Sequence, residues 1–248
     1  MQVWLAVTPA EAAEVSRRMR KLALVAYRIG KSGLLRQQPL PNLGGCLLSI
    51  RDRDAPPIPS PDRLAAAVLQ ECSQRGYSGV VADFEHSPTP DRIAFLKALK
   101  QRSGKAFPLL VPESCHFPGA TVLINTAVSG GSLAQRLKEA IERYPGAALD
   151  LQRLMMDFTL PAPSGEGKPL TASELSELKQ RLAPSVFFSP ELCARYFTYM
   201  QNGQVHFVLY DDAETLHQKM KLAEGLGYHT ALMMYPEVID LMEQLFPV

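Results

Sequence analysis

The stretch YSGVVADFE, residues 77–85, decides the fold, because apolar and small residues lead directly into two carboxylates. Such a run, followed by the turn residues His86-Ser87-Pro88, is typical of a strand buried on both faces of a parallel sheet. Side chains alternate along a strand, so Asp83 and Glu85 point to the same side. Active sites of parallel α/β proteins form at the carboxyl ends of strands, which predicts an acidic site here. The pair could instead cap the next helix or bind a cation.

The composition indicates a chain with a large core and almost no net charge. Of the 248 residues, 46% are hydrophobic, which is enough for one large α/β domain or two small ones. The 26 Lys and Arg nearly balance the 25 Asp and Glu, so neither nucleic acid nor an anionic membrane is an expected partner.

Processing and metal-binding signals are also missing from the sequence. No stretch has the length of a membrane span, and the first residues lack the basic segment of a signal peptide. The four cysteines are scattered, with no spacing that suggests zinc. We therefore expect a reduced, cytoplasmic protein without a metal or other cofactor.

Strand and helix patterns alternate along the chain at the spacing of βα units. Eight strands are expected, at residues 2–7, 22–27, 45–50, 77–85, 107–111, 121–125, within 147–158, and 230–235. Helices are expected at residues 61–75, 91–102, 214–224 and 237–246, among others. Aromatic strands around Asn202-Gly203 predict a β-hairpin. The sequence therefore predicts one α/β domain over residues 1–248, a (β/α)8 TIM barrel with a small hairpin insertion before the last strand.

Three motifs resemble those of the family 18 glycoside hydrolases, the chitinase-like barrels, and especially their spore-type bacterial members. Residues 78–85 are similar to the strand-four signature Asp-Gly-x-Asp-x-Asp-x-Glu. Residues 157–161, DFTLP, resemble an Asp-Trp-Thr-Leu-Pro run at strand seven. Residues 196–227 are similar to the aromatic hairpin, the Tyr-acid-Asp turn and the lysine-bearing helix of that branch. Together the motifs span most of residues 77–235.

The resemblance implies hydrolysis of β-1,4-linked N-acetylglucosamine chains, in chitin or in peptidoglycan, by a retaining reaction in which the substrate assists. Glu85 would be the general acid that protonates the glycosidic oxygen, and later the base for water. Asp83 would orient the N-acetyl group, whose carbonyl oxygen attacks the anomeric carbon. Association with a spore or cell wall would be a second location beside the cytoplasm.

The sequence departs from the family pattern at several strand ends. Ser78 and Val81 replace the first two Asp residues of the strand-four signature, and residues 49–52, SIRD, replace Ser-x-Gly-Gly on strand three. Residues 124–127, INTA, stand where strand six ends in Met-x-Tyr-Asp, and Met234 falls at the strand-eight Trp that floors the sugar site. The lost Tyr and Trp would each contribute to transition-state stabilisation.

Further candidates for substrate binding follow the expected strand ends: Arg28, Arg51, Glu113, Asn125, Asp157, Met234 and Tyr235. The two arginines could bind an acidic substituent, such as a lactyl or carboxyl group of peptidoglycan, or pair with rim acids. His86 should face away from Glu85 and hydrogen-bond at the entry of the next helix.

Two alternatives to a working hydrolase stay open. The first is a catalytically impaired barrel that binds glycan or a protein partner, which the lost Tyr and Trp favour. The second is an unrelated barrel chemistry, which is disfavoured because the sequence has no His-x-His metal pair and no glycine-rich phosphate loop after strand seven.

Overall fold

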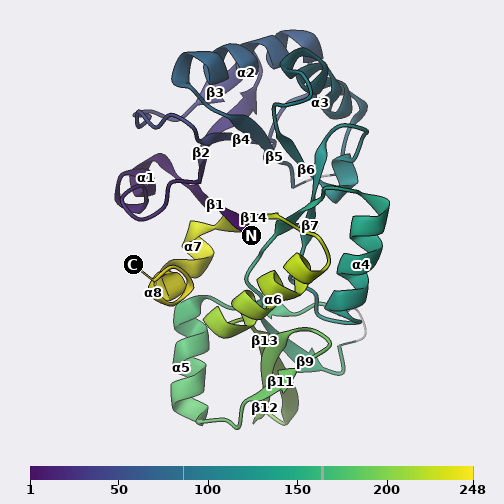
Figure 1. Cartoon of the computed structure of the whole chain (residues 1–248). Helices are drawn as coiled ribbons and strands as arrows, with labels where there is room; N and C mark the ends of the chain where they lie inside the picture. Colours follow the sequence, from purple (N-terminus) through teal and green to yellow (C-terminus); the bar gives the residue numbers. More distant parts are fainter. Residues whose placement is uncertain (86, 163–164, 248) are drawn as a thin grey trace.

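The computed structural model describes residues 1–85, 87–162 and 165–247. Eight parallel strands form its centre: β1 (Gln2–Val7), β2 (Leu22–Gly30), β4 (Leu47–Arg51), β5 (Gly79–Asp83), β6 (Leu109–Pro112), β7 (Thr121–Asn125), β8 (Ala148–Asp150) and β14 (Thr230–Met234). Each strand pairs with the next, and β1 pairs with both β14 and β2, which closes the ring (Figure 1). The predicted (β/α)8 barrel is therefore confirmed.

Helices surround the barrel, and most begin where the sequence predicts. They are α1 (Pro9–Val15), α2 (Pro61–Arg75), α3 (Pro90–Ser103), α4 (Leu133–Arg143), α6 (Ala213–Gly225), α7 (Tyr235–Val238) and α8 (Met242–Leu245). Proline is the first residue of α1, α2 and α3, where its missing N–H has no helical partner to lose. The helix expected at residues 237–246 is instead broken into α7, a 3₁₀ turn (Ile239–Leu241) and α8. No helix in the described residues is long and apolar enough to cross a membrane.

The strands have two buried faces, as the apolar run in β5 predicts. Val80 and Ala82 belong to the large core between the strands and the helices. Val81 points the other way, into a smaller apolar cluster inside the barrel that also contains Trp4, the only tryptophan of the chain. Asp83 follows Val81 on this inner side, so the alternation of β5 brings its carboxylate to the mouth of the barrel.

Residues 147–158 hold the seventh barrel strand, as predicted, but the motif DFTLP, which the resemblance places at strand seven, does not belong to that strand. That strand is β8, which ends at Asp150, whereas residues 155–160 form β9 (Met155–Leu160) of a separate antiparallel sheet. The segment from Ala147 to Phe158 contains no Gly, Pro, Asn or Ser to mark a turn, so the sequence pattern alone did not separate the two strands.

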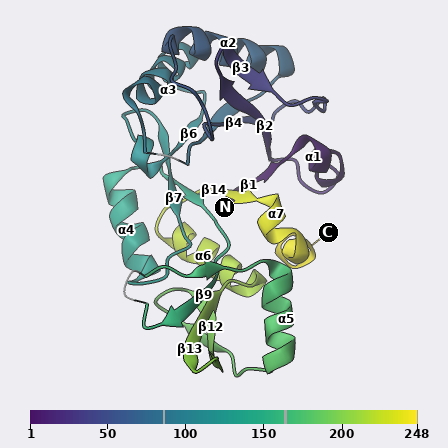
Figure 2. The ribbon, with the colours of Figure 1, turned by 180° about the vertical axis from the view of Figure 1, so that it is seen from behind.

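The insertion before the last strand is larger than the small hairpin that the sequence predicts. The hairpin exists as β12 (Ala194–Gln201) and β13 (Gln204–Tyr210), joined at Asn202-Gly203. It belongs to a five-stranded sheet in the order β10 (Lys168–Pro169), β9, β13, β12 and β11 (Phe187–Ser189). Helix α5 (Ala172–Leu182) packs on this sheet through Leu175 and Leu178. Figure 2 shows the sheet and α5 together at one side of the barrel.

Candidate active site

The carboxyl ends of the barrel strands surround a cavity of about 550 Å³. Its inner wall is apolar and includes Val81, Leu123 and Leu232 of the cluster inside the barrel. Its polar lining comes from strand ends and the loops that follow them: Ser49, Arg51, Asp83, Glu85, Glu113, Asn125, Arg136, Asp150, Gln152 and Glu237. The structure thus brings Asp83 and Glu85 together with four of the expected rim residues, namely Arg51, Glu113, Asn125 and Met234.

Asp83 is the carboxyl with the most altered proton affinity in this cavity. Its pKa is raised from the ordinary 3.8 to about 6, mainly by burial; Arg51 opposes the shift, and the nearby Glu85, Asp150 and Asp52 add to it. Desolvation disfavours the charged form of a carboxyl, and neighbouring carboxylates act in the same direction. Asp83 can therefore hold or release a proton near neutral pH.

Glu85 follows the end of β5, and its backbone is held by a buried ion pair. Its N–H donates to Asp52 Oδ1 at 3.0 Å, and Asp52 Oδ2 accepts from Arg92 Nε at 3.0 Å. Arg92 also donates to Thr89 Oγ1 at 2.9 Å and to the Ala55 carbonyl at 3.1 Å. These bonds connect the segments after β4 and β5, which positions Glu85 at the cavity while its side chain stays exposed.

Two further cavity acids, Asp150 and Glu237, were missed by the sequence analysis. Burial raises the pKa of Asp150, and the hydrogen bond that Asn125 Nδ2 donates to it at 3.0 Å partly opposes this rise. Burial also raises the pKa of Glu237, whose Oε2 accepts from the Arg153 N–H at 3.1 Å. The sequence does contain a signal for Asp150, because this residue ends a short apolar run, as Asp83 does. Glu237 had none, since it lies after the last strand in α7.

Arg28 and Tyr235 were expected at the substrate site but do not line this cavity. Tyr235 begins α7 and is buried in the core between strands and helices. Arg28 lines a neighbouring hollow that shares Arg51 with the cavity. The expected role of His86 lies outside the described residues.

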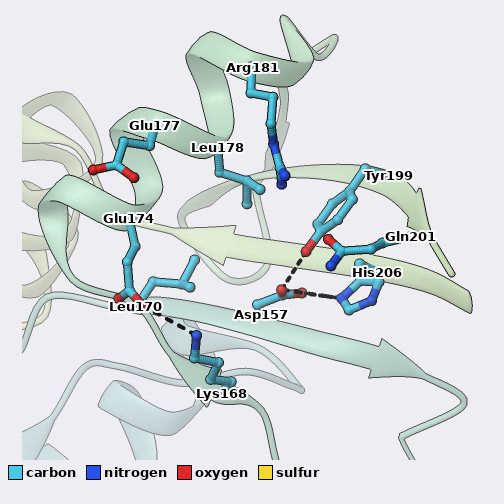
Figure 3. Close-up of a pocket in the computed structure, with 10 residues that line it drawn as sticks. All are labelled: Asp157, Lys168, Leu170, Glu174, Glu177, Leu178, Arg181, Tyr199, Gln201 and His206. Carbon is cyan, nitrogen blue, oxygen red and sulfur yellow. Dashed lines mark hydrogen bonds and ion pairs between the residues drawn. The ribbon is translucent and has the colours of Figure 1, made fainter.

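Asp157 lies in the antiparallel sheet rather than at a barrel strand end, because it belongs to β9. Its carboxylate accepts a hydrogen bond from the Tyr199 hydroxyl at 2.7 Å and lies 3.0 Å from His206 Nδ1. All three side chains line a pocket of about 420 Å³ between α5 and the sheet (Figure 3). The His206 ring stacks on Tyr199 with 4.6 Å between centroids. The expected placement of Asp157 at the barrel rim was therefore wrong.

Paired carboxylates can bind cations, and a cation was one alternative role for Asp83 and Glu85. In residues 1–85, 87–162 and 165–247, no three His, Cys, Asp or Glu side chains gather in an arrangement that could hold a metal ion.

Comparison with known proteins gives structural but not sequence matches. No protein-family model and no curated protein sequence matches the chain. The spore cortex-lytic enzyme SleL of Bacillus megaterium is similar over 99% of this chain and 74% of its own, with TM-score 0.67 and 18% identity. The class V chitinase of Nicotiana tobaccum is similar over 99% and 98%, with TM-score 0.71 and 11% identity.

A third structure connects the fold with a bound glycan. It is a variant of the family 18 chitinase of Cycas revoluta in complex with (GlcNAc)4, similar over 99% of this chain and 98% of its own, with TM-score 0.66 and 13% identity. At these identities the likeness establishes the fold and not the activity. The chain therefore has the barrel fold shared by the family 18 chitinases and the spore cortex-lytic enzymes.

Proposed function

We propose that the protein is a glycoside hydrolase that acts on β-1,4-linked N-acetylglucosamine chains by substrate-assisted retaining hydrolysis. The observation that carries this proposal is that Asp83 and Glu85, two residues apart on one chain segment, line the same cavity at the barrel mouth. The fold shared with a chitinase that binds (GlcNAc)4 supports a glycan ligand.

Glu85 is the proposed general acid and base. Its exposed carboxyl group donates a proton to the glycosidic oxygen while the carbonyl oxygen of the substrate N-acetyl group attacks the anomeric carbon. The C–O bond to the leaving sugar breaks, and a cyclic oxazolinium ion forms. Glu85, now ionised, then takes a proton from water as the water oxygen attacks the anomeric carbon and the ring opens.

Asp83 is the proposed partner of the N-acetyl group. It lies deeper than Glu85, and its pKa of about 6 allows it to change protonation during the reaction. In its ionised form it accepts a hydrogen bond from the amide N–H of the substrate and stabilises the positive charge of the oxazolinium ion. Arg51, which lowers the pKa of Asp83, favours that ionised form.

The alternative is a catalytically impaired barrel that binds a glycan chain or a protein. It is favoured by the two positions where the resemblance expects Tyr and Trp, since Thr126 and Met234 occupy them. Met234 lines the cavity, and so does Asn125, the neighbour of Thr126. Met234 gives the sugar ring an apolar contact but no aromatic face, and the Asn125 amide already donates to Asp150 and Gln152.

A turnover assay separates the two functions. The wild-type protein is incubated with chitotetraose and with peptidoglycan glycan strands, and released reducing ends are counted. Glu85→Gln is expected to lower kcat by about 10²- to 10⁴-fold, the usual contribution of general acid–base catalysis. Glu139→Gln, an exposed change on α4, is the matched control.

Hydrolysis that persists undiminished in Glu85→Gln contradicts the mechanism. If wild type and Glu85→Gln bind chitotetraose equally in calorimetry and neither cuts it, the protein binds glycan without hydrolysing it, and the alternative function is correct.

A further inference from the structure

Three charged residues lie side by side at the carboxyl ends of β2, β4 and β5. Arg28 is paired in register with Arg51, and Arg51 is paired with Asp83. Paired residues on neighbouring strands point to the same side of a sheet. Because Arg51 and Asp83 line the cavity, Arg28 extends the same row towards the rim of the barrel.

An irregularity in β2 produces this orientation of Arg28. The pairing of β2 with β4 passes from Val25 and Ser49 directly to Tyr27 and Ile50, so Ala26 is the extra residue. Val25 faces the interior of the barrel, and uninterrupted alternation would also turn Tyr27 inwards. Tyr27 instead lies in the outer core, where its hydroxyl donates to Glu71 at 3.0 Å. The bulge therefore reverses the alternation and turns Arg28 to the inner side.

Arg28 and Arg51 border a second hollow, of about 390 Å³, beside the candidate active site. The lining of this hollow is Ala26, Tyr27, Arg28, Leu35, Arg36, Gln37 and Arg51, with three arginines and no carboxylate. Arg36 pairs with Glu71 at 3.1 Å. Within the described residues, neither Arg28 nor Arg51 forms an ion pair.

The two arginines in register repel each other, and Asp83 on the other side of Arg51 offsets part of that charge; a bound anion would offset more. Like charges directly opposite each other on neighbouring strands repel and destabilise the pair. Arginine presents a planar fork of N–H donors that matches a carboxylate, and both Arg28 and Arg51 line this hollow. Since Arg51 lines both hollows, a group bound beside Arg28 would lie next to a ligand held by Asp83 and Glu85.

We propose that the hollow at Arg28 and Arg51 is a subsite for a carboxylate carried by the glycan chain. The preferred substrate is then an acidic N-acetylated glycan rather than a neutral one. This inference rests on the proposed function and specifies its substrate class.

Calorimetry with two matched ligands tests the subsite. The ligands are chitotetraose and a β-1,4-linked tetrasaccharide of the same length with a lactyl carboxylate on alternate sugars. We expect Glu85→Gln, used to prevent turnover, to bind the acidic chain about tenfold more tightly, which corresponds to one charge-assisted contact. This preference should shrink as salt concentration rises.

Arg28→Gln, in the same Glu85→Gln background, should abolish the preference. Lys31→Gln is the matched control, because it removes one positive charge from an exposed residue next to the same strand, outside the hollow. Equal affinity for both chains in the parent protein overturns the inference, and so does a preference that survives in Arg28→Gln.

A second measurement separates this inference from the proposed function. Inorganic phosphate and lactate are titrated separately while the arginine side-chain N–H signals are followed by NMR. If lactate shifts the Arg28 and Arg51 signals and no tetrasaccharide binds, the anion site stands and the glycan function fails. If chitotetraose binds and lactate shifts neither signal, the glycan function stands and the carboxylate subsite fails. If phosphate shifts the Arg28 and Arg51 signals to saturation and lactate does not shift them, the hollow is a phosphate site, which also overturns the inference.

Discussion

The Asp52 carboxylate accepts the backbone N–H of Glu85 at 3.0 Å, across two segments that are 33 residues apart in the chain. Asp52 has no exposed surface, and its charge is paired with Arg92, which is nearly as buried. An ionised carboxylate can remain buried only with such a partner and with hydrogen bonds to its oxygens. The proposed general acid is thus positioned by a buried ion pair that does not itself line the cavity.

Replacing Asp52 by Asn should reduce catalysis by displacing Glu85. The amide keeps one acceptor oxygen, but it removes the negative charge 3.0 Å from the buried Arg92 and leaves Asp91, at 3.7 Å, as the remaining counterion. We expect kcat to fall by about 10- to 100-fold with KM nearly unchanged, since small displacements of catalytic groups have effects of this size. Steady-state kinetics on chitotetraose and the amide hydrogen exchange rate of Glu85 are the measurements.

Asp62→Asn provides the comparison for this prediction, because Asp62 pairs with Arg102 on the surface at 2.8 Å. Surface pairs contribute about 0–1 kcal/mol, so this variant should fold and turn over normally. A folded Asp52→Asn protein with wild-type kcat and an unchanged Glu85 exchange rate would show that the contact is not needed.

Asp83→Asn should stabilise the protein at neutral pH. The native pKa of Asp83, about 6, lies above its ordinary 3.8, so the native state binds the proton more tightly than the unfolded chain does. The Asp83 carboxyl therefore stabilises the native state at low pH, and this contribution is lost as pH rises from about 4 to about 6. A shift of two units corresponds to about 3 kcal/mol, so we expect Asn to raise the free energy of unfolding by about 2–3 kcal/mol at pH 7.5.

At pH 4 the same substitution should change stability little, because the native Asp83 carboxyl is already neutral there. Urea denaturation at both pH values is the measurement. Asp54→Asn, an exposed change at a left-handed backbone position that Asn tolerates, is the control. Equal effects of Asp83→Asn at the two pH values would contradict the assigned pKa.

Lys219→Met should be strongly destabilising, because Lys219 is buried opposite Asp211 with 2.7 Å between Nζ and Oδ2. Asp211 also accepts the Leu154 N–H at 2.9 Å, and Lys219 donates to the Thr126 carbonyl at 3.2 Å. Removing one partner of a buried ion pair costs about 3–5 kcal/mol, and urea denaturation should show that loss. The loss should shrink at low pH, as the unpaired Asp211 takes up a proton.

The control for Lys219 is Lys221→Met, an exposed change on the same helix that should shift stability by less than about 0.5 kcal/mol. Adding Asp211→Asn to Lys219→Met should restore part of the lost stability, because it removes the unpaired charge. If the single and double variants are equally unstable, packing rather than charge explains the loss.

Local sequence was sufficient for much of the barrel. The alternation in residues 79–83 and the prolines that begin α1, α2 and α3 depend on contacts within a few residues, and they were predicted correctly. Asp83 was found for the same reason, since alternate residues of one strand share a side whatever surrounds the strand. Glu85 lies two residues beyond the end of β5, and its backbone is held by Asp52.

Tertiary structure decided which distant segments complete the site. Whether the segment before Asp150 or the one around Asp157 forms the seventh barrel strand depended on which of them found partners in β7 and β14, because each is a short apolar stretch with a carboxylate. Glu237 enters the cavity from α7, and Arg28 turns to the rim only because β2 pairs with β4 through a bulge. Strand pairing and burial are set by contacts across the whole chain, so no local pattern encodes them.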